Sequence, residues 1–341
     1  MKSSRTCIGL WMTCVLLCLA AAPRRACAED ASSGAPFSAP QRGAWLAAKK
    51  SPSKKTPSRS KPASSTRKSA VAPTDKSRHA ETPSDPQDPL QLAARGAIVI
   101  DALSGAPLYE KNADARYFPA STTKIMTALL VIEDGALDQE VEVTEEDARV
   151  GESSLDIRAG QRFSRMQMLY GLMLKSANDV AHALGRDNGG SIETFAQKMT
   201  ARARELGCTN THFTNPHGLH HPEHYTTARD LALITRAAMN QPVFRQLVST
   251  RQASWVNGTL PPRTLENHNR LLARFPGCIG VKTGYTIPAQ QVLASAATRG
   301  GREAIAVVMH TDKPGIWDDS TKLLDFALIR PAEEAPAAQN P

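Results

Sequence analysis

Cysteine is scarce in this chain once its first 28 residues are set aside. Four of the six cysteines lie within residues 7–27, which leaves Cys208 and Cys278 for the rest of the 341 residues. A disulfide needs Cα atoms about 5.5–6 Å apart, and the sequence does not show whether these two cysteines approach each other. A catalytic thiol needs a positioned histidine partner, and no motif of that kind surrounds either cysteine, so we expect no thiol catalysis.

Excess positive charge is missing from the larger part of the chain, although the whole sequence has a net charge of +8. Of the 41 Lys and Arg residues, four lie in residues 1–28 and eleven in residues 29–92, so residues 93–341 hold 26, against 27 Asp and Glu. A nucleic-acid-binding domain needs a basic patch on its folded part. We therefore expect no nucleic acid partner.

The chain also lacks a long apolar run. Its best candidate, residues 7–22, is shorter than the roughly 20 residues of a membrane-spanning helix. Lys2 and Arg5 precede this run, and the small-x-small sequence Ala26-Cys27-Ala28 follows it. This pattern predicts a secretory signal peptide over residues 1–28, with an uncleaved membrane anchor as the alternative. We expect an exported protein of the periplasm or cell envelope, membrane-associated if the signal is retained.

Residues 29–89 are dense in Ser, Pro, Ala and Lys, as in the stretch KKSPSKKTP at 49–57. Such a composition buries too little apolar surface to offset its ordering entropy, so we expect a disordered tether. Its basic charge suits contact with anionic envelope polymers or lipid head groups, and simple solubility is the alternative. The Ala- and Pro-rich residues 331–341 are expected to be a disordered tail.

Residues 90–330 have the size of one α/β catalytic domain. Short apolar runs around Ser104-Gly105 predict a hairpin at 96–110, and those around Gly300-Gly301 predict a second one at 292–309. Apolar residues at helical spacing, with capping residues, predict helices from Ser121 to Gly135, after Ser164, over 192–206, after Thr227 and over 321–328, and the run 141–144 predicts a strand.

Ser121 and Lys124 form the first candidate catalytic motif. If Pro119 and Ala120 lead into a helix, residues three apart share a face, which places the Ser121 hydroxyl beside the Lys124 amine. A lysine activates a serine as a free amine, so burial or nearby positive charge must lower its pKa from about 10.4. Ser-x-x-Lys alone is weak evidence, because the same residues also occur at ordinary helix starts.

Two further motifs follow along the chain. Ser176 and Asn178 lie at a predicted helix–helix turn, where a hydroxyl and an amide can face a cleft or simply cap the helices. Lys282-Thr283-Gly284 lies in a strand-like run, where it would present an ammonium and a hydroxyl, with glycine leaving room for a substrate backbone. The order of the three motifs is that of penicillin-binding proteins and class A β-lactamases.

Four histidines in the loop 213–225 raise the possibility of a zinc site. We do not predict one, because no helix or strand register fixes their geometry and no thiolate lies nearby. These histidines are His217, His220, His221 and His224.

With these motifs, residues 94–328 resemble the serine-type D-Ala-D-Ala carboxypeptidases, which are low-molecular-weight penicillin-binding proteins. The matching stretches are 118–127, 174–179, 215–219, 227–231 and 280–286. The resemblance implies an α/β (α+β) β-lactamase/transpeptidase-like fold, with an antiparallel sheet flanked by helices, an all-α region and an active site in the cleft between them. It implies no cofactor and no metal.

The resemblance also implies roles for particular residues. Catalytic roles fall to Ser121 as the nucleophile, Lys124 as its base and Ser176 in a proton relay with Lys282. Asn178 would hold the substrate amide, Thr283 the terminal carboxylate, and the backbone N–H groups of Ser121 and Tyr285 the oxyanion, with Gly284 beside them. The implied substrates are peptidoglycan stem peptides, and β-lactam antibiotics would be covalent inhibitors.

Three alternatives stay open at this point. A D,D-endopeptidase that cleaves peptidoglycan cross-links would use the same residues. A class A β-lactamase is less expected, because no Glu-x-x-Leu-Asn stretch lies between Ser176 and Lys282. A non-catalytic peptidoglycan-binding module is the third alternative.

The chain departs from the family pattern in a few places. The family's arginine beyond the final strand is replaced by a segment with Lys313, and Arg270 is a candidate substitute. Ala289-Gln290 replaces the usual Ala-Gly. We also expect the family's C-terminal β domain and membrane helix to be absent.

Overall fold

The computed structural model describes residues 88–256 and 261–329. The predicted signal peptide, nearly all of the predicted tether and the predicted tail lie outside these residues. Asp88, which we had assigned to the tether, is buried and accepts hydrogen bonds from the Leu92 N–H at 3.0 Å and the Tyr109 hydroxyl at 2.5 Å. The folded part therefore begins at least two residues before the expected boundary at Leu90.

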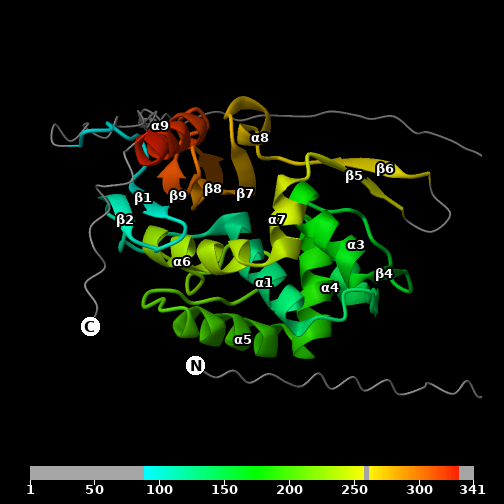
Figure 1. Ribbon diagram of the computed structural model, residues 1–341. Helices are drawn as coiled ribbons and strands as arrows, with labels where there is room; N and C mark the ends of the chain where they lie inside the picture. The colour runs from blue at the N-terminus through cyan, green and yellow to red at the C-terminus, as the bar shows by residue number, and fades with distance from the viewer. Residues whose placement is uncertain (1–87, 257–260, 330–341) are drawn as a thin grey trace, which may run out of the picture. The chain divides into compact units, whose positions relative to one another are not determined.

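A five-stranded antiparallel sheet forms the centre of the domain (Figure 1). Its strand order is β2-β1-β9-β8-β7, so β7 lies at an edge, and both predicted hairpins are confirmed. Along β7, Lys282 pairs with Ala294 and Tyr285 with Gln291. The strands are β1 (Gly96–Asp101), β2 (Pro107–Lys111), β7 (Cys278–Thr286), β8 (Gln290–Arg299) and β9 (Arg302–Thr311).

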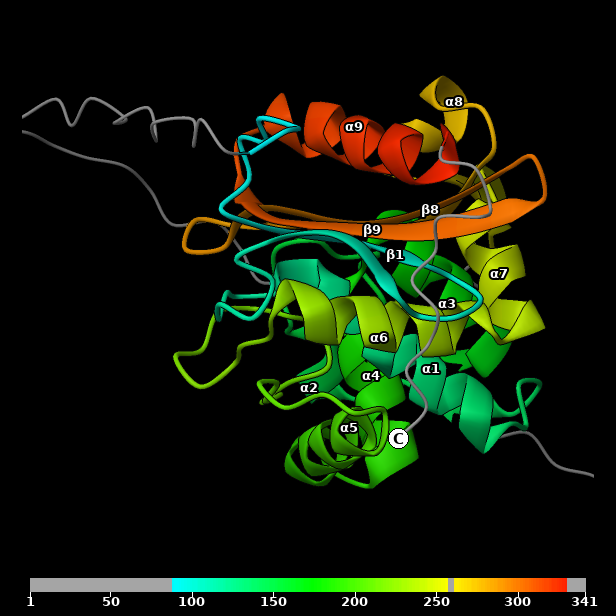
Figure 2. The ribbon, with the colours of Figure 1, turned by 60° about the vertical axis from the view of Figure 1, so that its left-hand side comes forward.

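Helix α9 (Gly315–Ile329) covers one face of the sheet (Figure 2). It is longer than the predicted 321–328, because it starts directly after a turn in which the Asp312 carboxylate accepts the Gly315 N–H at 2.6 Å. Strands β8 and β9 read as nearly continuous apolar runs, since both of their faces are covered, as in other sheets packed between helices. The core on this face includes Leu293 and Val308 of the strands and Leu323 and Leu324 of the helix.

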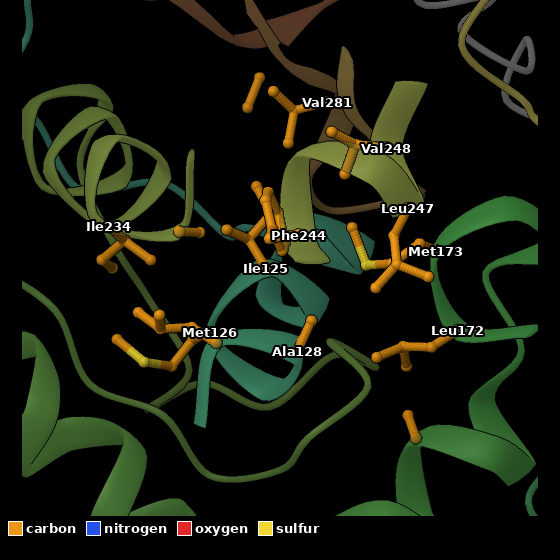
Figure 3. Close-up of a cluster of buried hydrophobic side chains, with 14 of the residues drawn as sticks. Ile125, Met126, Ala128, Leu172, Met173, Ile234, Phe244, Leu247, Val248 and Val281 are labelled. Carbon is orange, nitrogen blue, oxygen red and sulfur yellow. The ribbon is translucent and has the colours of Figure 1, made fainter. Parts of the chain in front are cut away.

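The other face packs on α1 (Lys124–Asp134), α6 (Ala228–Met239) and α7 (Pro242–Ser249) (Figures 1 and 2). Ile125, Met126 and Phe244 belong to one buried cluster with Val281 of β7 (Figure 3), and each is 1% exposed or less. Burying such a side chain contributes about 1.5–3 kcal/mol, so this cluster fixes α1 firmly beneath the edge strand. That contact decides where the functional residues meet.

The remaining elements form the all-α side of the domain and two small ribbons. Ser164 and Thr227 cap their helices as predicted, by accepting the N–H groups of Gln167 and Asp230. The predicted strand 141–144 is shorter, because Thr144 instead caps α2. The elements are η1 (Ala120–Thr123), β3 (Glu140–Glu142), α2 (Glu145–Ala148), β4 (Arg162–Ser164), α3 (Arg165–Tyr170), the π-helical η2 (Gly171–Lys175), α4 (Asn178–Gly189), α5 (Ile192–Glu205), β5 (Gln252–Trp255), β6 (Arg263–Glu266) and α8 (Leu271–Arg274).

The two cysteines of the domain are both free. Cys208 Sγ lies 3.5 Å from the Asp230 carbonyl, and Cys278 Sγ lies 3.3 Å from the Gly280 carbonyl. Within residues 88–256 and 261–329, no helix is sufficiently long and apolar to span a bilayer.

Candidate active site

Ser121 lies in the 3₁₀ turn η1, and Lys124 is the first residue of α1. The turn places both side chains on one face, with Lys124 Nζ 3.0 Å from Ser121 Oγ. The predicted contact between hydroxyl and amine is therefore present. Ser121 is half-buried and reaches the cavity, whereas the Lys124 side chain is fully buried beneath it.

Three oxygen atoms surround the Lys124 amine. Besides Ser121 Oγ, they are Asn178 Oδ1 at 2.7 Å and the His217 carbonyl at 2.6 Å. Burial, and then the nearby positive charge of Lys282, hold the pKa of Lys124 well below its ordinary value. The lowered pKa favours the neutral amine form of Lys124 over its ammonium form. The neutral amine then offers its lone pair to the Ser121 hydroxyl proton, as a general base must.

The histidine-rich loop holds the nucleophile turn in place. The Thr127 hydroxyl donates to the Pro216 carbonyl at 2.6 Å, and the Thr123 hydroxyl lies 2.8 Å from His224 Nε2. Gly218 has φ of 89°, and a Cβ atom there would overlap the Ala120 carbonyl oxygen, so glycine is required by both backbone and space.

Two of the four loop histidines are structural. His217 and His224 are buried, and burial lowers the pKa of His224 to about 3, so it stays neutral as a hydrogen-bonding group. Among the residues that the structure describes, no three His, Cys, Asp or Glu side chains converge as a metal site would require.

Ser176 and Asn178 form the opposite side of the site. Ser176 ends η2 in the left-handed conformation (φ 63°), which lets α4 start directly after it and turns Ser176 toward the cavity that Ser121 also lines. Asn178 Oδ1 accepts from Lys124 and its Nδ2 donates to the Gly151 carbonyl at 3.1 Å, and the expected contact of Asn178 with the substrate amide stays a prediction. Its observed contacts therefore position the base.

Strand β7 forms the second wall. Gly284 approaches the nucleophile turn so closely that a Cβ atom would lie 2.9 Å from the Ser121 nitrogen. The glycine thereby allows Thr283 and Tyr285 to flank Ser121. Lys282 is buried, burial lowers its pKa to about 7, and its Nζ donates to the Thr283 carbonyl at 2.9 Å.

A cavity of about 200 Å³ lies between these two walls. Its lining includes five predicted residues, namely Ser121, Ser176, Thr283, Gly284 and Tyr285. The other three predicted residues are buried next to the cavity. Lys124 contacts Ser121, Asn178 contacts Lys124, and Lys282 contacts Thr283.

Three residues of the lining were not found from the sequence, namely Ser153, His268 and Gln291. Gln291 reaches the lining because it pairs with Tyr285 across the sheet, in a strand register that we had not predicted. Ser153 and His268 come from loops without a local signal. The two candidates for a carboxylate-binding cation, Lys313 and Arg270, are not part of the lining, and the Arg270 guanidinium instead lies 5.8 Å from the Trp317 ring centroid.

The arrangement has the parts of a serine acyl transferase. The Ser121 hydroxyl faces a cavity, and the buried Lys124 amine lies within hydrogen-bond reach of it. The positive end of the turn leading into α1 lies beside β7, an edge strand with polar side chains. An edge strand also offers free backbone groups to an extended peptide. The site therefore suits nucleophilic attack on a peptide carbonyl.

Comparison with known proteins agrees with this chemistry. Residues 80–313 match the profile of the peptidase family described as D-alanyl-D-alanine carboxypeptidase. The chain is 36% identical over 267 residues to D-alanyl-D-alanine carboxypeptidase DacF of Bacillus subtilis. The aligned region covers 76% of this chain and 66% of the relative. It is 36% identical over 235 residues to D-alanyl-D-alanine carboxypeptidase DacB2 of Mycobacterium tuberculosis, with coverage of 67% and 80%.

Among solved structures, the Streptomyces K15 DD-transpeptidase superposes with a TM-score of 0.66 at 35% identity. The superposition covers 69% of this chain and 97% of that protein. The expected fold, an antiparallel sheet with helices on both faces and an α-helical region, is therefore confirmed.

Proposed function

Because the chain belongs to the D-alanyl-D-alanine carboxypeptidase family, a family of penicillin-binding serine peptidases, we propose that it removes the terminal D-alanine from peptidoglycan stem peptides. The reaction proceeds through an acyl-enzyme on Ser121. The observation that carries this proposal is the 3.0 Å contact between Ser121 Oγ and the buried Lys124 Nζ, whose pKa is lowered.

Acylation starts when Lys124 takes the Ser121 proton and Oγ attacks the carbonyl of the penultimate D-alanine. The C–O bond forms as the carbonyl π electrons move to oxygen. The N–H groups of Ser121 and Tyr285 stabilise this oxyanion, and such a donor contributes about 3–4 kcal/mol to transition-state stabilisation. Asn178, which accepts from Lys124 at 2.7 Å, keeps the amine aimed at Oγ.

The leaving D-alanine needs a proton on its nitrogen when the C–N bond breaks. Ser176 and Lys282 supply this relay, supported by the position of Ser176 on the cavity wall and by the Lys282 pKa of about 7, which suits proton exchange near neutral pH. The Thr283 hydroxyl binds the terminal carboxylate. Water then attacks the acyl-enzyme, with Lys124 again as base, and releases the shortened peptide. Penicillins acylate the same Ser121 because their β-lactam carbonyl takes the place of the scissile one.

The test uses the purified protein with a fluorescent penicillin and, in parallel, with a muropeptide ending in D-Ala-D-Ala, followed by mass spectrometry. We expect labelling of Ser121 and release of one D-alanine per peptide. Labelling combined with cleavage of cross-linked dimers alone would replace this proposal by a D,D-endopeptidase. A folded protein that is neither labelled nor active would exclude catalysis.

We also propose that residues 1–28 direct export and are then cleaved, so that the enzyme works in the periplasm or cell envelope. The Lys2 and Arg5 charges, the apolar run 7–22 and the small residues at 26–28 support this proposal. N-terminal sequencing of the protein from its own cells is the test, and a sequence starting at Met1 would contradict cleavage. The basic residues 29–89 then contact anionic envelope polymers. We therefore expect isolated cell walls to retain the protein in a salt-sensitive way, and deletion of residues 29–89 to abolish this retention.

A further inference from the structure

A second cavity, of about 470 Å³, lies beyond the end of β7. Its lining includes Phe118, three residues before the nucleophile, and Pro288, three residues after Tyr285. Tyr117, His310, Arg95 and Arg116 are also part of it. None of these side chains has a role in the acyl-transfer chemistry derived above.

Two guanidinium groups give this cavity a positive charge. Arg116 is held in place, because its Nε and Nη2 donate to Asn210 Oδ1 at 3.2 and 2.9 Å and its Cζ lies 4.3 Å from the Tyr225 ring centroid. Asn210 is neutral, so this anchoring leaves the charge uncompensated. Arg95 lies close enough to Tyr117 and His310 for its charge to lower the pKa of both groups, although burial has the larger effect on each.

The described residues provide no carboxylate within ion-pair distance of Arg95 or Arg116. Glu223 is the acidic residue of the lining, so its one negative charge is outnumbered by the positive charges of two arginines. Burial keeps His310 neutral by lowering its pKa, so it adds a hydrogen-bonding group rather than charge. A cavity with two arginines and aromatic walls favours an anionic ligand with an apolar or aliphatic body.

The direction of the substrate connects this cavity with the active site. In the proposed reaction the leaving D-alanine lies against Ser176, Lys282 and Thr283, so the acyl part of the peptide extends the other way, past Tyr285. Strand β7 is a sheet edge, and an extended peptide can add to it as a further strand. Tyr285 is 54% exposed and Ile287 is 78% exposed, so apolar surface continues along this path to Pro288.

The end of β7 places this cavity on the acyl side of the scissile bond. Strand β7 ends at Thr286, and the chain turns back over residues 287–289 to pair Thr286 with Gln290, so Pro288 of the cavity lies in the turn just past the strand. A peptide that lies along β7 and continues past Tyr285 therefore leads toward the cavity. On this side of the scissile bond a stem peptide carries the γ-linked D-glutamate, with its free α-carboxylate.

We propose that Arg95 and Arg116 form a subsite that binds the α-carboxylate of the γ-linked D-glutamyl residue of the donor stem peptide. This inference rests on the proposed function and names a substrate class for it. The enzyme distinguishes acidic stem peptides from those in which this carboxylate is amidated.

The experiment compares two tetrapeptides, acetyl-γ-D-glutamyl-L-lysyl-D-alanyl-D-alanine and the same peptide with D-isoglutamine in place of D-glutamate. We expect kcat/KM to be about tenfold higher for the acidic peptide, mainly through KM, because a remote contact acts equally on ground and transition states. In Arg95→Gln/Arg116→Gln this preference disappears, while kcat/KM for the amidated peptide stays within about twofold. Arg204→Gln, an exposed arginine on α5, is the matched control and retains the preference.

Binding of both peptides to Ser121→Ala, checked for folding by its melting temperature, separates the two proposals. If the unchanged protein cleaves neither peptide but Ser121→Ala still binds the acidic one more tightly, the subsite stands and the proposed reaction fails. Equal cleavage and equal binding of the two peptides would overturn the subsite while leaving the reaction intact. An equal loss of activity on both peptides in the double variant would assign the arginines a structural role and overturn the subsite as well.

Discussion

The two walls of the active site differ in how their residues are held. On the helical wall, Lys124 and Asn178 are buried, and the hydrogen-bonding groups around them are used within the protein. On the strand wall, Thr283 is half-buried and Tyr285 is 54% exposed, at the open edge of the sheet. One wall is therefore organised before substrate arrives, whereas the other offers unused groups to it.

This difference indicates which part of the site controls which step of the proposed reaction. A preorganised, buried wall sets the pKa values that acylation needs, since low polarity and neighbouring charge act on lysine there. An open strand edge recognises the peptide backbone and can accept different substrates. Changes to the helical wall should therefore reduce the rate of chemistry, and changes to the strand wall should affect the oxyanion, the proton relay and specificity.

The largest expected effect is the loss of the base. Lys124→Ala removes the amine that lies 3.0 Å from Ser121 Oγ, so acylation by a fluorescent penicillin should slow by roughly 1,000-fold or more. Stopped-flow or gel-based labelling measures this rate constant. Lys322→Ala, at an exposed lysine of α9, is the control and should label at the unchanged rate. Normal labelling of Lys124→Ala would show that another group activates Ser121.

The next largest effect comes from closing the gap between the walls. In Gly284→Ala the new Cβ would lie 2.9 Å from the Ser121 nitrogen and 3.0 Å from the Pro119 carbonyl, so the two must separate. Because the Ser121 N–H is an oxyanion donor in the proposed reaction, kcat/KM should fall by about 100-fold. Gly300→Ala meets no atom within 4 Å and should cost about 1 kcal/mol of stability with unchanged kcat/KM. Equal activity of the two variants would contradict the close contact.

The helical wall could largely be predicted from the sequence, and the reason is local. Spacing of three residues places Ser121 beside Lys124 once the segment is helical, and caps such as Ser164 and Thr227 mark helix starts through hydrogen bonds to nearby N–H groups. The strand that carries Lys282-Thr283-Gly284 also followed from the strand-like run around it. These features depend on neighbours in the chain.

Other features depend on distant contacts and were missed. Ser153 reaches the cavity on a loop that the buried Asp179 carboxylate holds, by accepting from the Ser154 hydroxyl at 2.6 Å and from nearby backbone N–H groups. The β5–β6 ribbon was not predicted, because Trp255 and Leu265 are its buried residues and two apolar positions give no clear period. The helix predicted after Ser164 continues as the π-helical η2, which no local propensity signals.

A smaller effect is expected from the titration of Lys282, the buried lysine of the strand wall, on kcat/KM. With its pKa lowered to about 7, Lys282 loses its charge as the pH rises through neutrality, so kcat/KM should show a descending alkaline limb near pH 7. Each pH unit above that limb reduces kcat/KM by about tenfold. Lys282→Arg stays charged, since arginine is not deprotonated in proteins, so the limb should disappear even if the maximum is lower. A limb of unchanged position in this variant would assign it to another group.

The smallest effect concerns the stability of the helical wall rather than its chemistry. His224 is 2% exposed, its Nε2 lies 2.8 Å from the Thr123 hydroxyl, and burial lowers its pKa from 6.5 to about 3. Between these two values the unfolded state binds a proton that the folded state does not, so stability falls with falling pH by up to about 1.4 kcal/mol per unit. His224→Gln should lose about 1 kcal/mol of unfolding free energy at pH 7.5 from the lost hydrogen bond, and should flatten this acid slope by one proton.

Urea unfolding at pH 7.5, 6, 5 and 4 measures both quantities, with His221→Gln at an exposed position as the matched control. An unchanged slope in His224→Gln would mean that the turn beneath the nucleophile does not depend on a neutral histidine.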